Sequence, residues 1–172
     1  IGESFAGYEL GFDSEIVKYI TSANIATGFH AGDPDWMART VKLAVDNGVG
    51  IGAHPAYPDL AGFGRRNMDL TPSEVHNAVT YQMGALAAFS PYRKLQHVKP
   101  HGALYNTAVR DGAVAEAIVM AVKAFDLDLI HVVLAGSKWE SIARSHGVRV
   151  IRECYADRAV TVEGTLVPRS QP

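Results

Sequence analysis

The segment Ser22–His30 reads SANIATGFH, an apolar run that ends in a histidine just before a turn. The pattern recurs twice, since His54 closes VGIGA (residues 49–53) and His101 follows QHVKP (residues 96–100). A helical pattern follows each run, so we predict that the three histidines stand at the carboxyl ends of strands in a β/α protein. Ligands and catalytic groups gather at that edge of α/β sheets and barrels, which makes it the expected place of a functional site.

Strand-like and helical patterns alternate along most of the chain. Strands are predicted to begin near residues 22, 48, 96, 127 and 149, with helices over about 34–47, 71–86, 111–125 and 137–146. The clearest helix starts are the cap Asp33-Pro34 and the capping box over residues 71–74. This order predicts parallel strands in either an open doubly wound sheet or part of a β/α barrel. Because an eight-unit barrel takes about 250 residues, a barrel here is expected to be a single domain over 1–172, incomplete at both ends.

The composition excludes several classes of function. The 172 residues are 48% hydrophobic and 20% charged with a formal net charge of −2, so nothing favours nucleic acid or an acidic membrane surface as a partner. The single cysteine, Cys154, excludes an internal disulfide and fits a reducing compartment. No apolar stretch approaches the roughly 20 residues of a membrane helix. We therefore expect a soluble, cytoplasmic protein.

Side chains at or near the predicted strand ends are the candidate catalytic groups: His30, His54, Lys99, His101 and Asp157. A histidine there can serve as a ligand, a general base or an oxyanion donor, or can simply be hydrogen-bonded at the end of its strand. Alternation along the third run places Lys99 on one face together with His97 and His101. A lysine at a buried strand end is costly unless it is paired, which favours a functional role.

The neighbouring polar side chains are predicted to bind substrate: Asp33, Tyr57, Asp59, Arg65, Arg66, Asn106, Glu153 and Arg158. Two prolines stiffen the loop that carries Tyr57 and Asp59. The adjacent Arg65 and Arg66 suit a carboxylate or a phosphate, although adjacent arginines on a loop are often only solvated. Asp33 is also a helix cap by its position before Pro34.

The sequence predicts no tightly bound metal. Histidines and carboxylates on one rim can bind zinc, but here the histidines come from separate strands, and no pair has the close spacing of a zinc motif on a helix. A phosphate-binding loop of the Gly-x-x-x-x-Gly-Lys type is also absent from the sequence.

The polar runs, taken together and in order, resemble the LamB/YcsF family. The matching segments are Gly2–Phe5, Thr21–Pro34, Ile51–Asp59, Gly62–Arg66, His97–Asn106, Ala156–Arg158 and Leu166–Arg169. The resemblance covers nearly the whole chain. It implies an irregular seven-stranded, TIM-like β/α barrel of the glycoside hydrolase/deacetylase type, here without its first strand and its C-terminal part.

The resemblance also implies an activity, the ATP-dependent opening of the lactam 5-oxoproline (pyroglutamate) to L-glutamate, with ATP hydrolysed to ADP and phosphate. It implies that the chain works with two further 5-oxoprolinase subunits, B and C. Because the sequence has no recognisable nucleotide-binding loop, we expect ATP with magnesium to be bound mainly by these partners. Two other functions stay open: a metal-dependent hydrolase like the polysaccharide deacetylases, using His30, His54 or His101, and a carrier or scaffold protein without catalysis. The sequence also leaves a homo-oligomer open.

Overall fold

The computed structural model describes residues 1–159, 161 and 165–167, so Pro168 and Arg169 of the family-like motif lie outside the described residues. Its strands are β1 Ser22–Ala26, β2 Gly50–His54, β3 His97–Val98, β4 Ile130–Leu134 and β5 Arg149–Glu153. Its α-helices are α1 Asp13–Ile16, α2 Pro34–Asp46, α3 Pro72–Phe89, α4 Gly102–Arg110, α5 Gly112–Phe125 and α6 Lys138–Ser145, with 3₁₀ turns η1 Val17–Tyr19 and η2 Pro91–Arg93. The predicted α/β class is confirmed.

The strands of the described residues form one parallel, five-stranded sheet in the order β1-β2-β3-β4-β5. A doubly wound sheet reverses its strand order at a switch point, and this sheet does not, so that alternative is wrong for these five strands. Sequential parallel order is the arrangement of strands in a β/α barrel. Within the described ranges no pairing joins β1 to β5, and the seven-stranded barrel stays a prediction.

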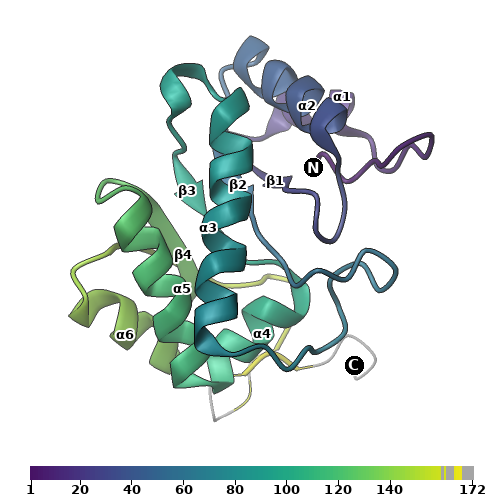
Figure 1. The fold of residues 1–172 in the computed structure, drawn as a ribbon. Coiled ribbons are helices and arrows are strands. Elements are labelled where there is room, and N and C mark those ends of the chain that lie inside the picture. Colours follow the sequence, from purple (N-terminus) through teal and green to yellow (C-terminus); the bar gives the residue numbers. More distant parts are fainter. Residues whose placement is uncertain (160, 162–164, 168–172) are drawn as a thin grey trace.

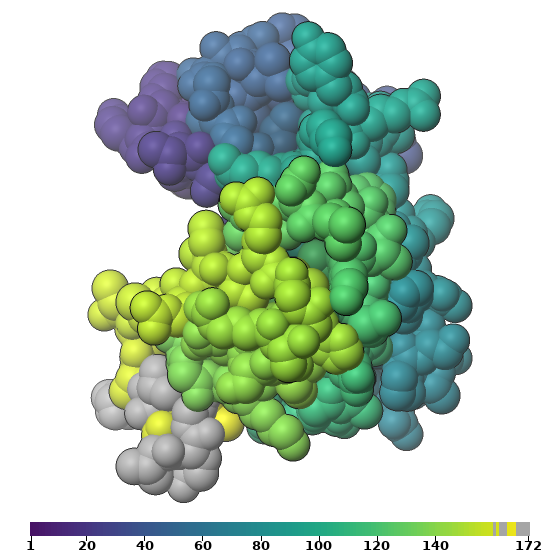
Figure 2. Space-filling model, turned by 90° about the vertical axis from the view of Figure 1, so that its left-hand side faces the viewer, coloured from purple at the N-terminus to yellow at the C-terminus, as the bar shows by residue number. Residues whose placement is uncertain are grey.

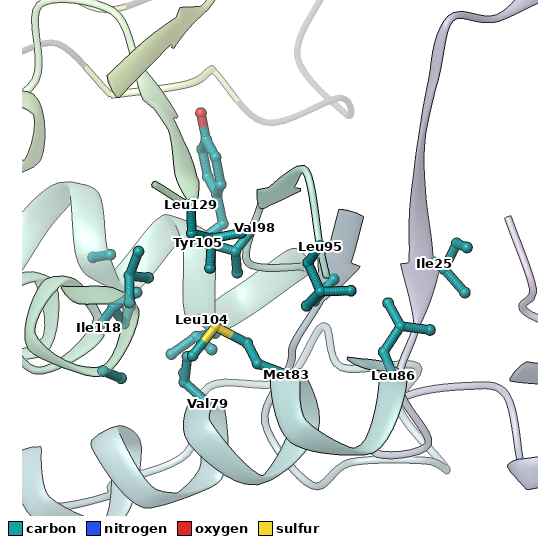
Figure 3. Packing of buried hydrophobic residues seen from close by; sticks show 14 of the residues in the cluster. Ile25, Val79, Met83, Leu86, Leu95, Val98, Leu104, Tyr105, Ile118 and Leu129 are labelled. Carbon is teal, nitrogen blue, oxygen red and sulfur yellow. The ribbon is translucent and has the colours of Figure 1, made fainter. Parts of the chain in front are cut away.

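The helices that follow the strands cover one face of the sheet and form the core with it (Figure 1). Ile25 on β1 and Val98 on β3 are fully buried against this layer. From the helix side, Met83 and Leu86 of α3 point towards the strands, as Figure 3 shows. Burying a large aliphatic side chain contributes about 1.5–3 kcal/mol. The continuous apolar layer therefore fixes the sheet under the helices.

The opposite face of β1 to β3 is polar. Nε2 of His97 lies 2.8 Å from Oδ1 of Asn24, across the intervening β2. Gly52 lies between them on β2, and a Cβ atom there would come within 2.0 Å of His97 Nε2. Side chains alternate along a strand, so the buried apolar set on one face leaves these residues on the other. Glycine is therefore needed at position 52, because any side chain there would block the contact between His97 and Asn24.

Local signals in the sequence placed the helix starts well. The Asp33 carboxylate accepts from the Trp36 backbone N–H at 2.9 Å, and Thr71 forms the predicted capping box with Glu74. The first turn of α4 was not predicted, because the helix begins at Gly102 with a positive φ and no side-chain cap. Among the described helices, none combines the length and the hydropathy needed to span a bilayer.

Candidate active site

A pocket of about 550 Å³ opens at the carboxyl edge of the sheet. Its wall combines residues from the N-terminal segment, the ends of β2 and β3, helix α4 and the segment after β5: Glu3, His54, Phe63, Arg65, Lys99, Pro100, His101, Gly102, Ala103, Tyr105, Asn106, Tyr155, Arg158 and Leu166. Figure 2 shows the purple N-terminal residues standing apart from the yellow residues of β5 and the described residues after it, with a notch between them. The pocket therefore lies where the strand-end rule places a functional site.

His54 and His101 face each other in the wall of this pocket. Nδ1 of His54 lies 2.6 Å from the carbonyl oxygen of Lys99, and Nε2 of His101 lies 2.8 Å from that of Phe63. The remaining ring nitrogens, His54 Nε2 and His101 Nδ1, are 3.1 Å apart. Both rings are thus fixed in orientation by a backbone carbonyl at the far side.

His30 lies behind this pair and is fully buried. Its ring stacks on His101 with centroids 4.0 Å apart and meets the ring of His54 edge-on at 5.6 Å. Neither of its nitrogens has a hydrogen-bond partner among the residues that the structure describes. The sequence placed the three histidines at three strand ends, and the structure brings them into one cluster.

All three histidines are held in the neutral form. Burial, with a smaller contribution from the neighbouring His101, lowers the pKa of His30 to about 3. Burial also takes the pKa of His54 well below its usual value, again with a contribution from His101. The pKa of His101 is lowered by burial, an effect that the hydrogen bond to Phe63 opposes in part. The cluster therefore offers lone pairs, as a base or a ligand does, at neutral pH.

Lys99 brings a cation to the same pocket. Its ammonium forms an ion pair with Glu153 at the end of β5 and lies 5.2 Å from the centre of the Tyr155 ring. Burial raises the pKa of both Tyr105 and Tyr155, and the nearby Glu153 raises it further in each. The hydroxyl groups of the two tyrosines therefore stay protonated and can donate hydrogen bonds into the pocket.

Several predicted substrate-binding residues have partners away from the pocket. Asp59 is buried in the loop between β2 and α3, where it accepts from Gly62 N at 2.9 Å and from Arg66 Nε at 2.9 Å. Tyr57 is buried in the core, and Asp33 caps α2. None of Asp33, Tyr57, Asp59 and Arg66 lines the described pocket, so the structure gives them positions that support the fold.

The other predicted residues divide between the pocket and its rim. Arg65, Asn106 and Arg158 line it. The guanidinium of Arg158 also donates to the carbonyl of Val167 at 2.6 and 3.2 Å. Glu153 contributes through its pairing with Lys99, and Asp157 is exposed and does not line the described pocket. Of the five predicted catalytic groups, His54, Lys99 and His101 thus line the described pocket, and His30 packs directly behind the two histidines.

Three polar residues of the described pocket were not singled out from the sequence: Glu3, Tyr105 and Tyr155. Tyr155 follows β5 by two residues, so the strand-end rule applied to the histidines would have included it. Tyr105 lies one turn beyond His101 on the unpredicted helix α4. Glu3 reaches the pocket because the N-terminal segment runs beside β1, where the Ile1 ammonium donates to the Asn24 carbonyl at 2.9 Å.

Comparison with known proteins agrees with this picture. The A subunit of 5-oxoprolinase from Pyrococcus furiosus is 57% identical over 174 aligned positions, which cover 100% of this chain and 68% of the relative. The protein of the same name from Syntrophobacter fumaroxidans is 54% identical, with 100% and 69% covered. The crystal structure of the lactam utilization protein from Thermus thermophilus superposes with a TM-score of 0.93 at 50% identity, covering 100% of this chain and 70% of that one. The model of the LamB/YcsF family matches residues 1–172, and the chain belongs to this family.

Proposed function

We propose that this chain is the A subunit of a 5-oxoprolinase and opens the lactam of 5-oxoproline to L-glutamate while ATP is hydrolysed to ADP and phosphate. The observation that carries the proposal is the likeness, at 57% identity over the whole of this chain and 68% of the relative, to the A subunit of 5-oxoprolinase from Pyrococcus furiosus. A polar pocket at the carboxyl edge of the sheet, lined by bases and cations, supports it independently.

The chemistry of lactam opening matches the groups in this pocket. A lactam is a stabilised amide, so attack by water needs an activated carbonyl, a base and a proton donor to the leaving nitrogen. The neutral imidazoles of His54 and His101 are placed to act as bases. Lys99 supplies a positive charge for the developing oxyanion or its phosphoryl group, and Tyr105 or Tyr155 supplies the proton donor.

The carboxylate of 5-oxoproline requires a cation at a second point of the pocket. Arg65 lines the pocket and its guanidinium lies over the Phe63 ring at 5.5 Å, a contact that orients its planar face. A guanidinium can hold a carboxylate through two parallel hydrogen bonds. We assign substrate-carboxylate binding to Arg65, with Asn106 as a neighbouring polar contact.

The proposal includes partners. The relatives are named as one subunit of their enzyme, which supports a complex in which subunits B and C bind most of the ATP and its magnesium. ATP activates the lactam by phosphorylating its oxygen, and this chain then directs hydrolysis. The sequential parallel sheet supports a β/α barrel as the complete fold, and a metabolic role of this kind supports a cytoplasmic location.

Reconstitution tests the proposal. The chain is mixed with subunits B and C from one organism, ATP, magnesium and 5-oxoproline, and both glutamate and phosphate are measured. We expect glutamate formation that depends on every component and falls steeply in Arg65→Ala through a raised KM. The exposed Arg39→Ala on α2, outside the pocket, is the matched control and should retain wild-type turnover. Glutamate formation by B and C alone would instead make this chain a carrier or a scaffold.

A further inference from the structure

The two neutral rings of His54 and His101 take part in more hydrogen-bond contacts than their N–H groups can supply with hydrogens. A continuous chain of three contacts runs from the Lys99 carbonyl through His54 and His101 to the Phe63 carbonyl, at 2.6, 3.1 and 2.8 Å. The carbonyl at each end can only accept, so each contact needs its own hydrogen. Two neutral imidazoles carry two N–H groups between them.

Every combination of tautomers of the neutral pair therefore leaves at least one contact between two acceptors. When both rings donate to the carbonyls, the lone pairs of His54 Nε2 and His101 Nδ1 point at each other across 3.1 Å. If the tautomer of either ring is reversed, a lone pair of that ring faces a backbone carbonyl oxygen instead, at the shorter separation of 2.6 or 2.8 Å. The first arrangement is the least unfavourable, and it creates a position between the rings that calls for a cation.

A metal ion suits this position better than an added proton. A proton would leave an imidazolium in a site where burial is the main cause that lowers the pKa of His101; the Phe63 carbonyl and Glu3 oppose this in part, and Arg65 and Lys99 add to it. Metal-bound imidazoles commonly donate their other N–H to a backbone carbonyl, and both rings have a carbonyl oxygen in position for this. Nitrogen ligands at zinc distances of about 2.0–2.1 Å stand about 3.3 Å apart in a tetrahedron, close to the separation of this pair.

His30 adds an independent observation. It is fully buried, and both ring nitrogens lack a partner in the part of the chain that the structure describes. An unpaired buried polar group is costly, so its retention calls for a reason. One nitrogen from each of His30, His54 and His101 lies within 4.8 Å of the others. Because the His30 ring is stacked on His101, it must tilt to bring its nitrogen to the same ion.

We propose that a divalent metal ion of the zinc type binds between His54 Nε2 and His101 Nδ1, with His30 as the third ligand. Since His54 and His101 also line the pocket, the fourth position faces it and is open to water or substrate, as in catalytic zinc sites. The site departs from the metal-free expectation drawn from the sequence, which rested on spacing along the chain; the ligands here converge from three separate strand ends.

With the ion bound, the imidazoles of His54 and His101 would be its ligands, and a water on the ion would replace them as the base. The ion would polarise the lactam carbonyl or that water, and this role alone rests on the proposed function. Binding of the ion does not, so it is tested without partner subunits, ATP or 5-oxoproline. The purified protein is treated with a chelator, incubated with equimolar zinc and passed through a desalting column, and retained zinc is measured by elemental analysis. Cobalt(II) is added to a second sample, and its visible absorption reports the coordination geometry.

We expect one zinc per chain and the intense bands of four-coordinate cobalt in the wild type. The double variant His54→Gln/His101→Gln should lose both, and His30→Gln should bind more weakly. His76→Gln on α3, outside the cluster, should retain both. The proposal is overturned if the wild type retains no more zinc than the double variant. If the double variant does not fold, absence of zinc retention and of four-coordinate cobalt bands in the wild type overturns it equally.

Discussion

The Lys99 ammonium forms an ion pair with the Glu153 carboxylate and so joins the segment after β3 to the end of β5, across the intervening β4. The two side chains are only 14% and 19% exposed, so water screens the pair weakly. The second carboxylate oxygen of Glu153 is buried without a hydrogen-bond partner in the described ranges. The pair thus fixes the position of a cation in the pocket and contributes to the packing of the sheet.

The first prediction concerns the charge of Lys99. Lys99→Met keeps most of the apolar stem and removes the ammonium, and loss of one preorganised electrostatic group typically lowers kcat by about 10²–10³. We expect glutamate formation in the reconstituted complex to fall by that factor. The thermal midpoint should also fall, because the variant leaves Glu153 as a part-buried carboxylate without its cation.

The double variant Lys99→Met/Glu153→Gln separates the two effects. Removing both charges should restore much of the thermal stability, because no unpaired carboxylate remains, while turnover stays low. Scanning calorimetry and the glutamate assay give the two readouts. Wild-type turnover in the double variant would show that Lys99 serves only the fold.

The second prediction concerns Gly64, which packs against the histidine cluster. Its φ is +65°, and a Cβ atom there would lie 2.8 Å from both His101 Cδ2 and His30 Cβ. Gly64→Ala should therefore displace these rings, lowering the thermal midpoint and the turnover of the complex. Gly84→Ala is the matched control, because Gly84 lies in helix α3 with no atom within 4 Å of an added Cβ.

The control variant Gly84→Ala should be more stable than the wild type. Alanine in a helix interior is favoured over glycine by roughly 0.5–1 kcal/mol, and Gly84 does not line the pocket. The urea concentration at the midpoint of unfolding should thus rise for Gly84→Ala and fall for Gly64→Ala. The rate of glutamate formation should fall only for Gly64→Ala. Equal stability of Gly64→Ala and the wild type would contradict the close packing described around His30 and His101.

Short-range signals predicted the fold better than they predicted the site. Asp33 and Thr71 cap helices through hydrogen bonds to residues three positions further along, so the local sequence was enough to predict their roles. That the three histidines lie close together was also predictable, because parallel strands end at one edge of the sheet. The pairing of Lys99 with Glu153 joins residues 54 positions apart, and nothing local specifies which carboxylate the lysine meets.

Asp59 shows what residue types alone leave open. The many polar residues of its loop favoured the prediction of substrate binding. In the structure the Asp59 carboxylate accepts hydrogen bonds from Gly62 and Arg66, which follow it by three and seven residues. Local satisfaction of a polar group by its own loop cannot be told from its use by a ligand on residue types alone. The metal expectation had the same limit, because spacing along the chain carries no information on ligands that meet from separate strands.

The third prediction concerns this loop. Hydrogen bonds from Arg66 and from backbone N–H groups lower the pKa of Asp59 to about 2. A carboxyl group whose folded-state pKa is lowered stabilises the fold above its unfolded value of 3.8, and that contribution is lost as the pH falls towards about 2. Asp59→Asn should remove it at neutral pH. Hydrogen exchange should then quicken at the Gly62 and Arg66 amides, and unchanged exchange there would contradict the assigned contacts.

The last prediction concerns His131 on β4, which lies on the helix side of the sheet. It is fully buried against Trp139, with ring centroids 5.0 Å apart, and neither ring nitrogen has a hydrogen-bond partner within the residues described. Burial lowers its pKa from 6.5 to about 3. Between these two pH values the unfolded chain binds a proton that the folded chain does not, so acid lowers stability there by up to about 1.4 kcal/mol per pH unit.

His131→Leu removes this proton uptake and keeps the site filled with apolar volume. The free energy of unfolding should differ from that of the wild type by a constant amount above about pH 7. Below pH 6.5 the variant should gain steadily on the wild type, because only the wild-type unfolded chain still takes up the extra proton at this position. His30 and His97, whose pKa values burial lowers to about 3 and about 4, titrate in both proteins and cancel in the difference. Urea unfolding at pH 7.5, 6 and 5 measures this difference, and parallel curves over that range would refute a buried neutral His131.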